Sequence, residues 1–313
     1  MVLGISINRR APRTSVGQRP RLMRWTVVVA ALAMLAALWI SAVPALVYFE
    51  AVGAFSSAHS ANSLGLDRYR VTIERQPIGG IGDNLSGLSY SNKTGTLFAV
   101  TNRPTQVVEL STDGHLLRTI ALEGATDPEG ITHVDGDRFI IADEGSQSLH
   151  WVTIRPNLSR LSLDGGERLK LNIGAMHNMG FEGLSWDASH QRLYVTQEMF
   201  PARVIVINGL EADAGLRLEI DEWRPKNWAG AFLIDLSSVS LHEPTGNLLL
   251  LSHMASMLVE HDPEGNVLST LPLWRGWHGL ERSVGQAEGV AVGPQGEIFI
   301  VSEPNLFYRF ERL

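Results

Sequence analysis

The sequence predicts an all-β fold, a β-propeller of five blades with six as the alternative count, preceded by one N-terminal transmembrane helix. Three observations lead to this prediction. A run of 25 residues, Trp25–Phe49, carries no charge. The chain after it consists of short apolar runs separated by turn residues. Five segments of that region repeat one pattern at offsets of 43 to 55 residues, and a period of this length is typical of propeller blades.

The N-terminal region has the pattern of a membrane anchor. Residues 1–24 hold six arginines and no acidic residue, which by the positive-inside rule places the N-terminus in the cytoplasm. The uncharged run is long enough to cross a hydrocarbon core of about 30 Å and too long for a typical cleaved signal. We therefore expect a basic cytoplasmic tail (1–24), a transmembrane helix (25–49) in which Pro44 introduces a kink, a linker (50–66) and the propeller (67–313). A signal cleaved near Ala51–Ala54 is the alternative.

The repeat predicts the blades and how the ring closes. Each copy reads as a strand, a polar turn and a second strand that ends in polar residues; the copies are Leu85–Asn102, Pro128–Glu144, Phe181–Glu198, Leu236–His253 and Ala287–Glu303. Further strand candidates follow each copy, but only Leu306–Phe310 follows the last. We expect Tyr69–Glu74 to supply the missing outer strand of the last blade, which would leave no open sheet edge. Residues Asn208–Gly230 leave room for a sixth blade. A β-sandwich is a further alternative, against which the five copies argue.

Composition excludes several classes of function. A net charge of −7 argues against nucleic-acid binding, which needs clustered Lys and Arg. The absence of cysteine excludes disulfides, thiolate metal sites, cysteine nucleophiles and a lipoprotein anchor. The sequence has neither the H-E-x-x-H spacing of a zinc site nor the G-x-S-x-G elbow of a serine hydrolase. Tryptophan and arginine gather in residues 223–228 and 273–282, which form either a ligand-facing rim or ordinary packing between blades.

Several motifs resemble those of a known family. FEGLSW (181–186), LSH (251–253), QAEGVAV (286–292) and VSEPNLFYRF (301–310) are similar to segments of the SdiA-regulated, YjiK-like family of bacterial propellers. The resemblance extends from about Tyr69 to the C-terminus. It implies a propeller anchored in the bacterial inner membrane and facing the periplasm, and says little about activity. NHL-repeat and phytase-like propellers are more distantly similar, and some of those bind calcium.

Two positions of the repeat are expected to place polar and acidic side chains in the central channel, because the innermost strands surround the axis of a propeller. The second position of each copy is Ser86, Glu129, Glu182, Ser237 or Glu288. The residue that ends the second strand is Asn102, Glu144, Glu198, His253 or Glu303. We therefore expect six carboxylates near one axis: Glu129, Glu182, Glu288, Glu144, Glu198 and Glu303. Like charges held this close need a counter-charge, and Ca²⁺ or another divalent cation with oxygen ligands is the simplest one. The alternative is that the glutamates accept backbone N–H bonds from neighbouring blades.

Two functions follow from this arrangement. The first is a periplasmic binding module with a calcium-type site, which recognises a peptide, a glycan or a small molecule. The second is a metal-dependent hydrolase of the lactonase or phytase type, in which one of Glu144, Glu198 and Glu303 acts as general base. No residue of the sequence identifies a catalytic group, so whether the protein is an enzyme stays open. The few lysines of the repeats speak against phosphate-ester substrates and favour the binding module.

Overall fold

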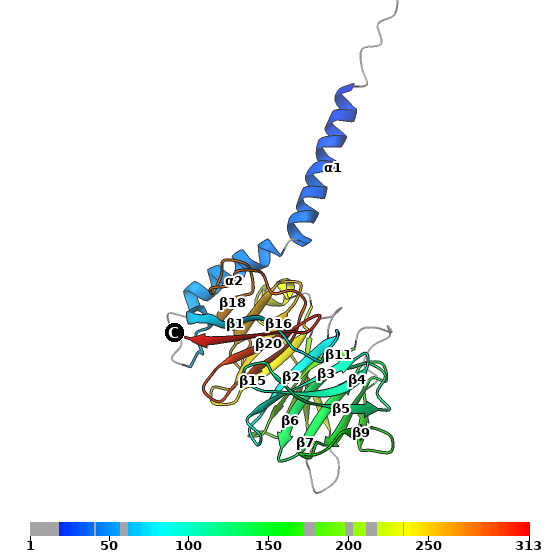
Figure 1. Cartoon of the computed structure of the whole chain (residues 1–313). Helices are drawn as coiled ribbons and strands as arrows, with labels where there is room; N and C mark the ends of the chain where they lie inside the picture. Colours follow the sequence, from blue (N-terminus) through cyan, green and yellow to red (C-terminus); the bar gives the residue numbers. More distant parts are fainter. Residues whose placement is uncertain are drawn as a thin grey trace, which may run out of the picture. The chain divides into compact units, whose positions relative to one another are not determined.

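The computed structural model describes residues 19–40, 42–56, 62–171, 180–197, 203–210, 218–233 and 235–313, with only the backbone for 19–23, 35–40 and 54–56 (Figure 1). Contacts within the chain divide it into two units, Met1–Val43 and Pro44–Leu313. The first unit contains helix α1 (Arg19–Ile40). The second begins with helix α2 (Val43–Ser56) and contains every strand that the structure describes.

The apolar region 25–49 forms two helices, which corrects the single helix predicted there. Ala42, between them, has φ of 58°, in the left-handed region where a helix ends. Pro44 lies in the first turn of α2, where its fixed φ favours a helix start and its missing N–H costs nothing. Among the helices that are described, none has both the length and the apolar character needed to cross a membrane.

The linker predicted over residues 50–66 is also corrected at both of its ends. Helix α2 continues to Ser56, and Gly53 of this helix is buried against the propeller. Leu64 and Leu66 are buried in a core cluster. The Glu260 carboxylate accepts hydrogen bonds from the Leu64 backbone N–H (2.8 Å) and from the Ser63 hydroxyl (2.6 Å). The segment 62–66 is thus part of the folded domain, as is the short 3₁₀ helix Leu66–Arg68 that follows.

The strands form five sheets, which are the blades. Blade 1 consists of β2 (Leu85–Ser91), β3 (Thr96–Asn102), β4 (Thr105–Leu110), β5 (Leu116–Glu123) and β9 (Arg160–Ser162). Blade 2 consists of β6 (Pro128–Asp135), β7 (Arg138–Asp143), β8 (Ser148–Thr153) and β10 (Arg168–Lys170). Blade 3 consists of β11 (Phe181–Asp187), β12 (Arg192–Gln197), β13 (Arg203–Asn208) and β14 (Glu219–Trp223).

Blades 4 and 5 complete the ring. Blade 4 consists of β15 (Ser238–His242), β16 (Asn247–Ser252), β17 (Met257–His261) and β18 (Val267–Pro272). Blade 5 consists of β19 (Ala287–Val292), β20 (Ile298–Ser302), β21 (Leu306–Arg312) and β1 (Tyr69–Pro77). Strand β1 pairs antiparallel with β21, so the predicted closure by Tyr69–Glu74 is confirmed. The five-blade count is confirmed as well, because the described part of Asn208–Gly230 holds β14 of blade 3 and the start of the short helix α3 (Ala229–Phe232).

The innermost strands β2, β6, β11, β15 and β19 contact one another in this order around the axis. Hydroxyl groups link them: Ser89 accepts a hydrogen bond from the His133 N–H (2.9 Å). Thr132 accepts one from the Trp186 N–H (3.0 Å), and Ser185 one from the Leu241 N–H (2.9 Å). The bonded residues occupy matching places in successive copies of the repeat. In the first three copies this small polar residue therefore links one blade to the next.

The core consists of five apolar clusters, each between two neighbouring blades. In the cluster between blades 1 and 2, for example, the rings of Phe98 and Phe139 lie 4.6 Å apart and are both buried. Glycine allows the close approach near the axis: a Cβ on Gly130 would lie 2.4 Å from the carbonyl oxygen of Glu182. This contact explains why glycine follows glutamate in three copies of the repeat.

Candidate metal centre at one end of the channel

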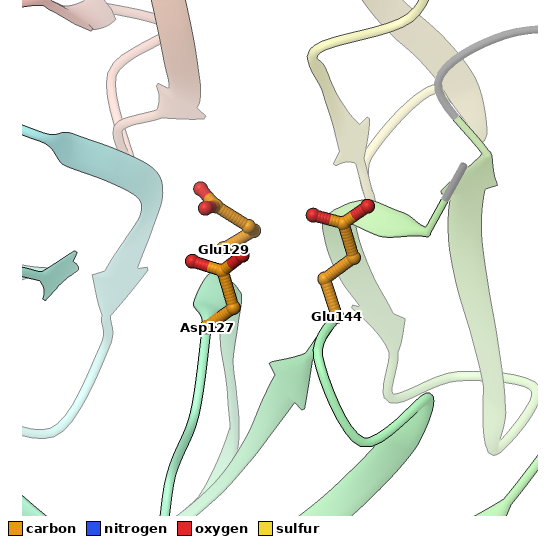
Figure 2. Close-up of side chains that lie close together, drawn as sticks. All are labelled: Asp127, Glu129 and Glu144. Atoms are coloured by element: carbon orange, nitrogen blue, oxygen red, sulfur yellow. The ribbon is translucent and has the colours of Figure 1, made fainter. Parts of the chain in front are cut away.

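Three carboxylates gather at the edge of blade 2. Asp127 directly precedes β6, Glu129 is its second residue, and Glu144 follows β7. These strands are antiparallel, with Pro128 opposite Asp143, so the start of one and the end of the other meet. One oxygen atom from each carboxylate lies within 4.8 Å of the others. Figure 2 shows the three side chains extending from the ends of these strands into the same space.

The backbone that carries the cluster is held by buried hydrogen bonds. The Asp143 side chain is fully buried and accepts bonds from the backbone N–H groups of Thr126 (2.9 Å) and Asp127 (2.6 Å). The Glu144 N–H donates to the Asp127 carbonyl oxygen (2.8 Å). Across the boundary to blade 3, the Gly180 N–H donates to Oε1 of Glu144 (3.0 Å). Any side chain at position 180 would collide with Glu144, because a Cβ there would lie 1.8 Å from its Cγ.

Asn102 adds a fourth oxygen-bearing group, from blade 1. Its amide nitrogen donates to Oδ1 of Asp127 (3.0 Å) and to Oε1 of Glu129 (2.9 Å). Its amide oxygen is buried and has no hydrogen-bond partner in the described part of the chain. Rotation of the amide by 180° would exchange the two atoms and direct the oxygen at the carboxylates. A cation among the carboxylates would favour that orientation.

Burial and the proximity of the other carboxylates raise the pKa of one carboxylate of the site. The pKa of Glu129 is raised from 4.5 to about 7: burial is the main cause, the charges of Asp127 and Glu144 act in the same direction, and hydrogen bonds from Ser86 and Asn102 act in the opposite direction. Without a counter-charge, the cluster therefore holds a proton at Glu129 near neutral pH.

The predicted ring of six carboxylates is brought together only in part. Glu129 and Glu144 share the cluster, and Asp127 joins them. Within the described residues Glu182 on blade 3 and Glu288 and Glu303 on blade 5 do not belong to this group. Glu198 lies outside the residues that the structure describes. The sequence reasoning missed Asp127, which precedes the second copy of the repeat by one residue, and passed over Asn102 because an amide has no charge.

A second polar group lies at the same end of the channel, on blades 4 and 5. His253 follows β16 as Glu144 follows β7, and its Nδ1 lies 3.9 Å from Oδ2 of Asp235. The Asp235 side chain is buried and accepts hydrogen bonds from the Ser252 hydroxyl and from the Met254 N–H (3.0 Å). Burial raises the pKa of Glu303, and Asp83 raises it further, whereas His253 lowers it. The imidazole, with 42% of its side chain exposed, is accessible to solvent.

A cavity of about 630 Å³ lies at the opposite end of the channel, where the innermost strands end. All five blades contribute to its lining, with Tyr90, His133, Trp186 and His242 as its ring-bearing residues. This volume is in the usual range for small-molecule sites. Burial lowers the pKa of His242, whose Nδ1 lies 2.8 Å from the Thr245 hydroxyl.

Comparison with known proteins gives a family and a fold. The sequence model of the SdiA-regulated family matches residues 61–311. Among solved structures, a luciferin-regenerating enzyme superposes with a TM-score of 0.51 at 12% identity, over 78% of this chain and 96% of the other. A streptogramin B lyase gives 0.45 at 10% identity (78% and 97%), and a structure of the nidogen–laminin complex gives 0.46 at 13% identity (71% and 73%). At such identities the likeness concerns the fold alone.

Proposed function

The chain belongs to the SdiA-regulated family, and we propose that it is a ligand-binding propeller with a calcium-type cation site formed by Asp127, Glu129, Glu144 and Asn102. One observation carries the proposal: three carboxylates converge beside the Asn102 amide, whose buried oxygen has no partner in the described chain and would face two of them after a 180° rotation of the amide. All four groups offer oxygen ligands, which suit hard cations such as Ca²⁺ and Mg²⁺. Ca²⁺ takes about 6–8 oxygens, so water or a ligand would complete its shell.

Calcium titration of the purified full-length chain in detergent tests this site. A cation at one hundred times its dissociation constant stabilises the folded state by about 2.7 kcal/mol. For a domain of this size we expect the midpoint of thermal unfolding to rise by roughly 5–10 °C. Glu144→Gln should abolish the rise, whereas the matched variant Glu264→Gln, at an exposed turn far along the chain, should retain it. A calcium effect of equal size in both variants would refute the assignment.

The ligand of the binding module is a peptide, a glycan or a small molecule. The cavity at the opposite end of the channel supports this part of the proposal, because its volume and its mixed aromatic and polar lining suit an organic ligand. A ligand screen read by thermal shift, compared between the wild type and Trp186→Ala, tests it. A ligand of this cavity would lose affinity in the variant and would bind whether or not calcium is present.

A metal-dependent hydrolase is the second candidate, and the contact between Asp235 and His253 favours it. The imidazole is exposed and lies 3.9 Å from a buried carboxylate, and an exposed imidazole is a common proton acceptor. The cation would polarise the carbonyl of a lactone or ester, and His253 would take a proton from the attacking water. Lactone turnover that needs both calcium and His253 would establish this function; turnover unchanged in His253→Gln would exclude it.

The inner membrane is the proposed location, with the N-terminus in the cytoplasm and the propeller in the periplasm. The six arginines before residue 25 and the uncharged part of α1, Trp25–Ile40, support it. Fractionation of bacteria that express the full chain tests it. We expect the chain to stay with the membrane pellet after alkaline carbonate washing, and protease added outside the inner membrane to reach the propeller. Release by carbonate would refute the anchor.

A further inference from the structure

Helix α2 is fastened to the propeller by apolar and polar contacts. Ala45 and Phe49 are buried in the cluster between blades 3 and 4. The Tyr48 ring stacks on Phe232 of α3, with centroids 4.8 Å apart and 27° between the planes. The carboxylate of Glu50 accepts a hydrogen bond from the Thr270 hydroxyl of β18 (2.9 Å). Helix α2 thus moves with the blades as one body.

The outward side of this region is apolar and aromatic. Val47 and Ala51 are exposed one helical turn apart, and Val47 keeps 63% of its surface accessible. Trp228 directly precedes α3, one turn before Phe232, and is 71% exposed. Val47 is the residue before Tyr48, and Trp228 lies one helical turn before Phe232, so both belong to the elements that the Tyr48–Phe232 stack joins. An exposed lysine, Lys226, lies two residues before Trp228. Exposed aliphatic, tryptophan and lysine side chains together are typical of chains that lie among lipid headgroups.

The lengths of α1 and of the connection between α1 and α2 also indicate that α2 begins at the membrane interface. The uncharged part of α1, Trp25–Ile40, covers about 24 Å at 1.5 Å per residue, less than a hydrocarbon core of about 30 Å. Helix α2 starts three residues after α1 ends, a distance of at most about 10 Å for extended chain. With α1 inserted, the first turns of α2 therefore lie in the membrane interface.

We propose that Val47, Ala51 and Trp228 form a membrane-seating surface, which rests in the headgroup layer of the bilayer that holds α1. This inference depends on the proposed anchor and deepens it. The propeller is then seated on the membrane by the edge formed by α2 and α3, because α2 is fixed to the blades. A flexible stalk would instead let the domain swing freely above the membrane.

Site-directed spin labelling of the full chain tests the seating surface, and the absence of native cysteine makes every label unique. Val47→Cys and Trp228→Cys place labels on the surface; Asn92→Cys, in the exposed turn between β2 and β3, is the control. The chain is reconstituted in vesicles of phosphatidylethanolamine and phosphatidylglycerol. We expect the labels at 47 and 228 to lose most collisions with a water-soluble nickel chelate and to gain collisions with oxygen, while the label at 92 keeps its aqueous values.

The outcomes separate the two proposals. Vesicle flotation after a carbonate wash reports on the anchor independently of the labels. Chains that float while all three labels stay aqueous would overturn the seating surface and leave the anchor intact. Chains that do not float would overturn both proposals. Thermal unfolding of each labelled variant checks that the propeller is folded, and Ala51→Cys offers a second label on the same surface if one of the others unfolds.

Discussion

Replacement of Glu129 by glutamine tests two properties of the acidic cluster: how much it destabilises the metal-free protein and whether it binds calcium. In the metal-free protein, burial and neighbouring charges raise the pKa of Glu129 from 4.5 to about 7. The folded state therefore holds this proton more tightly than the unfolded chain, and stability is lost as the pH rises from 4.5 through about 7. Converted at 1.36 kcal/mol per pH unit, the loss at pH 8.5 is about 3 kcal/mol.

Glutamine is neutral at every pH and can still accept the bond from Asn102. Without metal, Glu129→Gln should thus be more stable than the wild type at pH 8.5 by about 3 kcal/mol, or roughly 6–12 °C in unfolding temperature. At pH 4.5 the two proteins should differ little. Saturating calcium should reverse the order at pH 8.5, because only the wild type offers a third carboxylate to the ion.

Thermal unfolding of both proteins at pH 4.5 and 8.5, in chelator and in calcium, gives the complete comparison. The reasoning fails if the variant is less stable than the wild type in chelator at pH 8.5. It also fails if calcium stabilises the variant as much as it stabilises the wild type. Glu264→Gln, which changes the same charge at an exposed turn, controls for net charge.

Three further changes test the fold around the site. His261 is fully buried, and neither ring nitrogen has a hydrogen-bond partner within the described chain. Burial lowers its pKa from 6.5 to about 4, so the wild type loses about 3 kcal/mol of stability as the pH falls from 6.5 through 4. His261→Leu should not show this loss when urea unfolding at pH 7 is compared with urea unfolding at pH 4. Gly130→Ala should destabilise the protein by more than about 2 kcal/mol in the same assay, because the added Cβ would meet the Glu182 carbonyl oxygen. Gly82→Ala, with open space around it, should leave stability unchanged. Equal effects of the two substitutions would refute the argument that the blades approach closely at Gly130. Glu260→Ala leaves the buried Leu64 N–H and the Asn247 amide without their acceptor, so we expect a loss of about 3 kcal/mol and faster hydrogen exchange at Leu64, and unchanged exchange there would contradict this role.

The periodic part of the fold could be predicted from the sequence, because every copy of the repeat meets the same physical demands. A glycine near the axis, a hydroxyl on the inner strand and two apolar strands recur in most copies, so the blades are recognisable without their neighbours. Strand Tyr69–Glu74 was assigned to the last blade because that blade lacked an outer strand. The first argument uses only the local sequence pattern and the second only the number of strands in each blade, so neither needs side-chain geometry.

The features that the structure places differently depend on long-range packing. Residues 43–56 read as part of a membrane helix because apolarity alone does not distinguish a lipid-facing side chain from one such as Phe49, which packs between blades. The ring of six carboxylates assumed that equivalent positions converge equally. In the structure the cluster depends on features particular to blade 2, namely Asp127 at the entry to β6 and the buried Asp143 that shapes its turn.

Closure by β1 sets the order in which this chain can finish folding. Tyr69 pairs with Arg312, about 240 residues later, so the first strand of the propeller finds its partner only after β21 has been made. Until then blade 5 lacks its outer strand and both ends of the ring expose unpaired edges, which are prone to aggregation. Non-local pairing of this kind makes folding slow. A chain that stops before β21 is complete would have a ring that cannot close, and cells would have to shield or degrade it.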